Sequence, residues 1–134
     1  MEFNNKHFAA TATSRKQSIL VIDDSPESLY LGKTLLEREG FNVFTASSGT
    51  EAFNILNGIC DLNLVLLDMQ MEDMSGICFL ELLEKWKPNF LSYVPVVFYS
   101  AVDSVPLSKA AGFIRKAGDL NQFVKQVHGY IKLH

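Results

Sequence analysis

The sequence is poor in cysteine, in long apolar runs and in excess basic charge. Its two cysteines, Cys60 and Cys78, form no CxxC pair and no Cys/His cluster, so a disulfide framework is not expected. We expect two reduced, mostly buried thiols, which are typical of a cytoplasmic protein. No apolar stretch approaches the ~20 residues that span a membrane, so no membrane partner is expected.

Charge also excludes one class of partner. The 12 Lys and Arg residues are outnumbered by 15 Asp and Glu residues, which gives a net charge of −3. Without a basic stripe, nucleic acid is not expected as a partner. The chain has 134 residues, of which 48% are hydrophobic and 20% charged, and this suits one globular domain. We interpret residues 1–17 as a flexible N-terminal arm rather than a signal peptide, and residues 18–134 as the domain.

Apolar segments alternate with amphipathic ones along the domain. Strands are predicted at 18–23, 41–46, 62–68, 93–100 and 111–116. Helices are predicted at 26–39, 47–57 and 75–87 and after Asp119, with start signals at Ser25-Pro26, at Ser48 with Glu51, and at Asp119 with Gln122. Residues 101–110 contain Pro106 and leave room only for a brief helix.

This alternation predicts the α/β class. Continuous apolar strands between amphipathic helices indicate a doubly wound, five-stranded parallel sheet that is covered on both faces. Right-handed crossovers favour the strand order 2-1-3-4-5, with the fourth helix short or absent. In such sheets, ligands bind beyond the carboxyl ends of the strands.

Polar residues stand at those ends. Asp23 and Asp24 end the first predicted strand, Asp68 the third, Ser100 the fourth and Lys116 the fifth. Three carboxylates in one crevice repel each other and need a cation, and Mg²⁺ fits a site of two or three carboxylates with water. A central carboxylate beside a metal ion and a lysine can attack phosphorus. Asp68 is therefore the predicted nucleophile, which would become an aspartyl phosphate.

These residues resemble the receiver domain of two-component response regulators, which has a flavodoxin-like fold. The resemblance covers about residues 18–133 and rests on four segments: ILVIDDSPES, LVLLDMQMEDMSG, VVFYSA and AAGFIRK. It implies a phosphorelay role in which Asp68 accepts a phosphoryl group from a histidine kinase or a histidine phosphotransfer protein.

The resemblance also implies a role for each site residue. Asp23 and Asp24 would hold Mg²⁺ together with Asp68 and the main-chain carbonyl of Gln70. Ser100 and Lys116 would contact the phosphoryl oxygens. Phe113, three residues before the lysine, matches the aromatic switch position, where an inward turn of the ring accompanies movement of Ser100.

Three departures from the family pattern stand out. Ala117 follows the lysine where the family usually has proline, and Glu72 occupies another usual proline position. The span from Ser100 to Lys116 is too short for a full fourth helix. We therefore expect the output face that this helix forms in the family to be remodelled.

The sequence also allows two other functions. The alternative to a phosphoacceptor is a phosphorylation-independent, receiver-like interaction module. A hydrolase with an aspartate nucleophile is disfavoured, because the position two residues after Asp68 is Gln70, which cannot act as a general acid. We expect no enzyme activity beyond self-phosphorylation from a phosphohistidine donor and self-dephosphorylation. Because the sequence ends at the last predicted helix, output is expected through a downstream protein partner, which the sequence does not identify.

Overall fold

A five-stranded parallel sheet in the order β2-β1-β3-β4-β5 forms the centre of the molecule. The computed structural model describes residues 16–59, 61–101, 109–116 and 118–132. The strands are β1 (Ser18–Ile22), β2 (Asn42–Ala46), β3 (Leu64–Leu67), β4 (Val96–Ser100) and β5 (Gly112–Arg115). The helices are α2 (Pro26–Arg38), α3 (Gly49–Leu56), α4 (Gly76–Trp86), α5 (Phe90–Tyr93) and α6 (Leu120–Lys132). The predicted fold class and strand order are confirmed.

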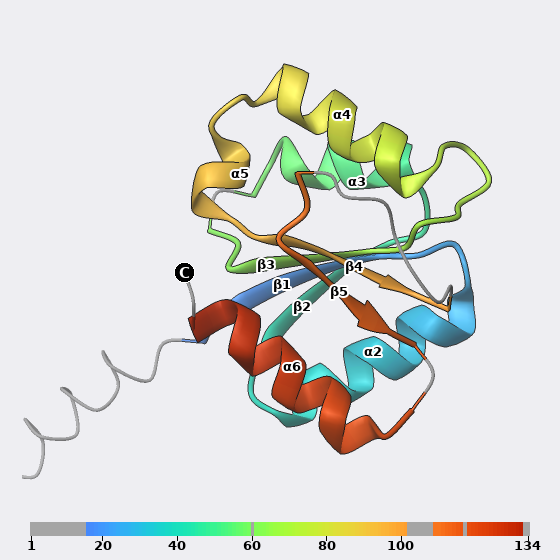
Figure 1. The fold of residues 1–134 in the computed structure, drawn as a ribbon, viewed down its shortest axis with the longest axis vertical. Helices are drawn as coiled ribbons and strands as arrows, with labels where there is room; N and C mark the ends of the chain where they lie inside the picture. The colour runs from blue at the N-terminus through green and yellow to red at the C-terminus, as the bar shows by residue number, and fades with distance from the viewer. Residues whose placement is uncertain (1–15, 60, 102–108, 117, 133–134) are drawn as a thin grey trace, which may run out of the picture.

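Helices cover both faces of the sheet. Figure 1 shows α3, α4 and α5 on one side and α2 and α6 on the other. Successive residues of β1 alternate between the two resulting cores: Leu20 and Ile22 pack on the α3 and α4 side, Ile19 and Val21 on the α2 and α6 side. This double burial explains why the strands are continuously apolar rather than alternating.

Serine caps confirm the predicted starts of α2, α3 and α4, although the side chain of Glu51 accepts from the N–H of Ser47 at 2.6 Å and not from Ser48. Each serine hydroxyl accepts a hydrogen bond from a main-chain N–H three residues on: Ser25 from Ser28 at 3.3 Å, Ser48 from Glu51 at 3.0 Å, and Ser75 from Cys78 at 3.0 Å. These bonds satisfy N–H groups that the first helical turn leaves unpaired. α2 is followed by Gly40, whose φ of 96° lies in the left-handed region that favours glycine.

One helix was not predicted, and four of the five strands begin one to three residues later than predicted. α5 is a single turn without a side-chain cap, too short to produce a helical period. It ends at Tyr93, so β4 begins at Val96 instead of the predicted residue 93. The expectation of mostly buried thiols is also wrong for Cys78. This residue is exposed, because it lies on the outer side of α4, away from the buried Phe79 and Leu83.

Residues 101–111 connect β4 with β5. The brief helix expected there falls mostly on residues 102–108, which lie outside the described residues, as do Cys60, Ala117 and residues 1–15 of the predicted arm. The described residues of the connection, Ala101 and 109–111, are not helical. The short connection is consistent with a fourth helix that is short or absent. In the described part of the chain, no helix is long and apolar enough to cross a membrane.

Candidate phosphoacceptor and metal site

The carboxyl end of β1 places two aspartates. Asp23 continues the ladder, since its N–H donates to Ala46 O at 3.0 Å. Its carboxylate accepts a bond from the N–H of Ser25 at 2.9 Å, and the residue is only 1% exposed. Asp24 follows and is half-buried. The buried strand therefore fixes Asp23 firmly, while Asp24 lies toward solvent.

The carboxyl end of β3 places Asp68 beside them. Its N–H donates to Ile22 O at 2.9 Å, and the residue is 7% exposed. Gly76, the first residue of α4, packs directly on this turn, because a Cβ there would lie 2.3 Å from the carbonyl oxygen of Asp68. The N–H of Gly76 also donates to Met69 O at 2.8 Å. The start of α4 thus closes tightly over the backbone that carries Asp68.

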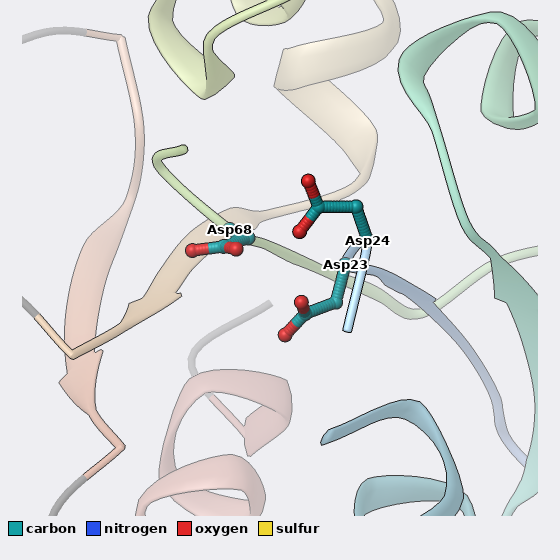
Figure 2. A group of neighbouring side chains, drawn as sticks. All are labelled: Asp23, Asp24 and Asp68. Atoms are coloured by element: carbon teal, nitrogen blue, oxygen red, sulfur yellow. The ribbon is translucent and has the colours of Figure 1, made fainter. Parts of the chain in front are cut away.

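Three carboxylates meet at this rim. Figure 2 shows Asp23, Asp24 and Asp68 at the ends of β1 and β3, and one carboxylate oxygen from each lies within 4.8 Å of the others. Such oxygen ligands suit a hard divalent cation. Placed this close together, the carboxylates also repel each other unless a positive charge intervenes. The cluster therefore fits a metal ion.

Lys116 supplies a positive charge to the cluster. Its Nζ lies 2.5 Å from Asp23 Oδ2 and 3.8 Å from Asp68 Oδ2. Its own N–H donates to Ser100 O at 2.8 Å, which extends the pairing of β5 with β4. From the edge strand, this side chain therefore crosses the ends of β4 and β3 to reach Asp23 on β1. Its Nζ also lies 5.6 Å from the centre of the Tyr99 ring, within the range of a cation–π contact.

The surroundings shift the pKa of Asp68 upward. Burial raises this pKa most, Lys116 lowers it and the charge of Asp23 raises it again. Hydrogen bonds from the N–H of Gln70 and the hydroxyl of Ser100 lower it further, but burial dominates. The charged form of such a carboxylate is stabilised when a positive charge is added nearby. Burial, and then the charge of Asp23, also raises the pKa of Tyr99.

The other predicted site residues are Ser100, Gln70 and Phe113, and each lies on a different segment of the chain. Ser100 ends β4 and is 2% exposed. The N–H of Gln70 lies 3.5 Å from Asp68 Oδ1, while metal binding by its carbonyl stays a prediction. Phe113 lies on β5, half-buried against the core on the α3 and α4 side. The structure thus brings Asp23, Asp24, Asp68, Lys116 and Ser100 to one rim. Phe113 lies on β5, and β4 separates this strand from β3, which carries Asp68 at its end.

Sequence reasoning missed three contributors to this site. The N–H of Glu72 donates to Asp24 Oδ2 at 3.0 Å. Asp73 accepts hydrogen bonds from the start of α3. Tyr99 lies under the lysine side chain. Only Tyr99 carried a signal, since it is a polar aromatic residue in an otherwise apolar strand segment, VVFYS.

Taken together, the site can do one kind of chemistry well. It offers a buried carboxylate nucleophile, a cation-binding acidic cluster, a lysine and a hydroxyl around one space. Such a set can hold the oxygens of a phosphoryl group and stabilise charge during its transfer.

Comparisons with known proteins agree with this geometry. The family model described as response regulator receiver domain matches residues 19–128. The transcriptional regulatory protein GlrR of Escherichia coli K12 is 34% identical over 93 residues, which cover 69% of this chain and 20% of GlrR. The cell cycle transcriptional regulator CtrA of Caulobacter vibrioides is 29% identical over 120 residues, which cover 85% of this chain and 50% of CtrA.

A solved structure gives the same result. The response regulator TrrA of Thermotoga maritima, in complex with Mg²⁺-BeF, has a TM-score of 0.73 and 27% identity, covering 85% of this chain and 98% of that one. The chain spans half or less of the length of the two curated relatives, so their whole activities do not transfer to it. The extent of the family match is decisive: the chain belongs to the response regulator receiver domain family of two-component systems.

Proposed function

We propose that the chain is a phosphoacceptor in a two-component phosphorelay, with Asp68 as the acceptor. One observation carries this proposal: a buried carboxylate at the end of β3 lies within reach of two further aspartates and 3.8 Å from Lys116. An acidic cluster alone would be common on a protein surface. An acidic cluster around a buried, centrally placed aspartate with its own lysine suits phosphoryl transfer.

The donor is a phosphohistidine of a histidine kinase or a histidine phosphotransfer protein. A carboxylate oxygen of Asp68 attacks phosphorus, the P–N bond breaks as the new P–O bond forms, and the released imidazole takes a proton from solvent. Lys116 and the Ser100 hydroxyl hold the transferred oxygens. Hydrolysis of the acyl phosphate later returns Asp68, so the chain acts on its own side chain and not on a separate substrate.

Mg²⁺ is the ion proposed for the acidic cluster. Asp23, Asp24, Asp68 and the carbonyl of Gln70 would hold it. When bound, it supplies positive charge that offsets the charge of the transferring oxygens. The relative TrrA, described in complex with Mg²⁺-BeF, supports this assignment.

Output is proposed to follow from partner binding. Formation of the phosphate would draw Ser100 toward it and allow Phe113 to turn inward, which changes the surface beside β5. The proteins that read this change are not identified by the site. We place the exchange in the cytoplasm, in line with the reduced thiols that the sequence predicts.

One observation favours the alternative function, a receiver-like module that binds partners without phosphorylation. The connection between β4 and β5 is too short in sequence for a full fourth helix, and its Lys109 pairs with Glu84 of α4 at 2.5 Å. A receiver-like module that binds partners without phosphorylation would also have this arrangement.

Binding of beryllofluoride, a phosphoryl mimic, tests the proposal. We expect amide chemical-shift changes that require Mg²⁺, centre on Asp68 and are lost in Asp68→Ala. Asp61→Ala is the matched control, because Asp61 is an exposed aspartate that precedes β3. Shifts that reach Phe113 would support the switch. Absence of binding by the wild type would reject the phosphoacceptor and favour the constitutive module.

A further inference from the structure

β2 is one of the two edge strands of the sheet. In a parallel pair, every second residue of a strand directs both of its main-chain groups to the neighbouring strand. The N–H of Asn42 donates to Gln17 O at 2.9 Å, and Ala46 O accepts from the N–H of Asp23 at 3.0 Å. Asn42 and Ala46 therefore face β1, and by the register of the two strands so does Phe44 between them.

The main-chain groups of Val43 and Thr45 point away from the sheet, because these residues occupy the alternate positions of β2. Within the part of the chain that the structure describes, neither residue has a hydrogen-bond partner on this side. Access to them is open, since Phe44 is 38% exposed and Asn42 is also exposed. Such groups can pair with a further strand.

This free stretch of the edge has clear limits. Before it, the N–H of Phe41 donates to Leu36 O of α2 at 3.1 Å. After it, the N–H of Ser47 donates to Glu51 Oε1 of α3 at 2.6 Å. Between these two positions, the unpaired N–H and carbonyl groups lie symmetrically on either side of Phe44.

The free edge also lacks the features that keep edge strands apart. Natural edge strands commonly carry a charge, a proline or a bulge. Residues 41–50 contain no charged residue and no proline, and β2 pairs with β1 without a bulge. The opposite edge is protected, since the N–H of Phe113 on β5 donates to Tyr130 Oη. Of the two edges, β2 is therefore the one that can accept another strand.

We propose that β2 pairs antiparallel with β2 of a second copy of this chain, about a two-fold axis at Phe44. In this register, Val43 of one copy lies opposite Thr45 of the other, and each N–H of the pair meets a carbonyl. Every outward N–H of the two residues is then satisfied. The two copies of Phe44 face each other as a non-hydrogen-bonded pair, with Cα atoms about 4.5 Å apart.

The observations favour a second copy as the occupant. A contact between identical surfaces needs groups that are symmetric about one point, and the free groups have this symmetry about Phe44. No like charges meet, although each copy has a net charge of −3. Pairing also uses up the free groups, so assembly stops at the dimer. A single short strand buries less than the ~1,200 Å² of a standard interface, so the dimer is weak and depends on concentration.

This inference goes beyond the proposed function and does not depend on phosphoryl transfer. Substitutions at Phe44 test the axis directly. Phe44→Lys and Phe44→Glu each place two like charges face to face, so each variant alone should remain monomeric. An equimolar mixture of the two variants should dimerise, because opposite charges then meet. Leu82→Lys is the matched control, since Leu82 is a similarly exposed apolar residue, at 42%, on α4 outside the sheet.

Sedimentation equilibrium from about 20 µM to 1 mM measures the association. We expect the average mass of the wild type and of Leu82→Lys to rise toward that of two chains over this range. Each single Phe44 variant should have a dissociation constant at least about tenfold higher, because like charges placed together in an interface are strongly unfavourable. The mixture should return to within about threefold of the wild type.

Hydrogen exchange locates the contact on β2. The N–H groups of Val43 and Thr45 should exchange more slowly at 1 mM than at 20 µM, whereas that of Phe44, which faces β1, should not change. Thr45→Pro removes one pairing N–H at a position where an edge strand tolerates proline, and it should also stay monomeric. A wild type that is monomeric at 1 mM, or a dimer that persists in Phe44→Lys, overturns the proposal. A dimer in which exchange of Val43 and Thr45 is independent of concentration overturns it as well.

Discussion

At the scale of single residues, the position of the Lys116 side chain depends on residues outside the family's sequence motif. Its side chain must cross the ends of two strands, and the Tyr99 ring lies beneath it with Nζ 5.6 Å from the ring centre. The ring itself is held by Phe123, with 4.9 Å between the two centres. Tyr99 is 9% exposed, so solvent weakens this contact little. A cation over an aromatic face is worth about 0.5–2 kcal/mol.

Replacement of Tyr99 should therefore slow phosphorylation of Asp68. We expect Tyr99→Leu to lower the rate with a small phosphodonor such as acetyl phosphate roughly three- to tenfold, because Lys116 loses its support. Tyr99→Phe keeps the ring and should stay within about twofold. In a Lys116→Met background, Tyr99→Leu should add no further loss. Equal rates for Tyr99→Leu and Tyr99→Phe, with both proteins folded, would contradict this role.

Some residues of the site could be predicted from the sequence and others could not. Asp23, Asp68 and Lys116 were predictable, because each follows an apolar strand and parallel strands bring their carboxyl ends together. The Glu72 bond to Asp24 was not predictable, because it depends on the direction of a main-chain N–H in an irregular loop. Asp73 likewise resembles any loop aspartate until the start of α3 is placed beside it.

At the scale of elements, β5 and α6 are joined by one tyrosine. The N–H of Phe113 on β5 donates to Tyr130 Oη of α6 at 3.2 Å. A Cβ on Gly112 would lie 2.0 Å from the same oxygen, so the ring of Tyr130 lies directly over this glycine. β5 is an edge strand, and such strands present unpaired main-chain groups. Tyr130 thus satisfies one of these groups and attaches the strand to its helix.

Two substitutions should loosen this attachment by different amounts. Tyr130→Phe removes only the hydroxyl and should lower the free energy of unfolding by about 1 kcal/mol. Gly112→Ala displaces the ring itself and should cost about 1–3 kcal/mol. Urea denaturation measures both, and hydrogen exchange of the Phe113 amide should accelerate in each. In Gly112→Ala with Tyr130→Ala, the penalty of the added methyl group should largely disappear. If Gly112→Ala lowers the free energy of unfolding by the same amount in the Tyr130→Ala background, the added methyl group does not clash with Tyr130.

Element boundaries followed the sequence where a local signal existed. The serine caps of α2 and α3 correspond to short-range hydrogen bonds and were predicted. α5 was missed because a single turn of four residues has no period to detect. The strand order could be predicted because crossover handedness leaves few arrangements.

At the scale of the whole molecule, burial of the charged Asp68 lowers the stability of the folded state at neutral pH. The sheet buries Asp68 beside Asp23, and burial raises the pKa of Asp68 above its ordinary value even though Lys116 lowers it. In the unfolded chain this pKa is about 3.9. Since the folded state disfavours the charged form, Asp68 contributes most to stability below that pH. This contribution is lost as the pH rises through the folded pKa.

Asp68→Asn should therefore stabilise the metal-free protein at neutral pH. We expect thermal midpoints in EDTA to be similar for the variant and the wild type near pH 4. The midpoint of the variant should exceed that of the wild type increasingly toward pH 7, by about 3–5 °C for each kcal/mol. Addition of Mg²⁺ should raise the wild type more than the variant, because a ligand that binds only the folded state stabilises it. Asp61→Asn, at an exposed position, should show no such pH dependence. If Asp68→Asn instead lowers the midpoint at pH 7, the attraction of Lys116 outweighs burial, and Asp68 supports the fold as well as the chemistry.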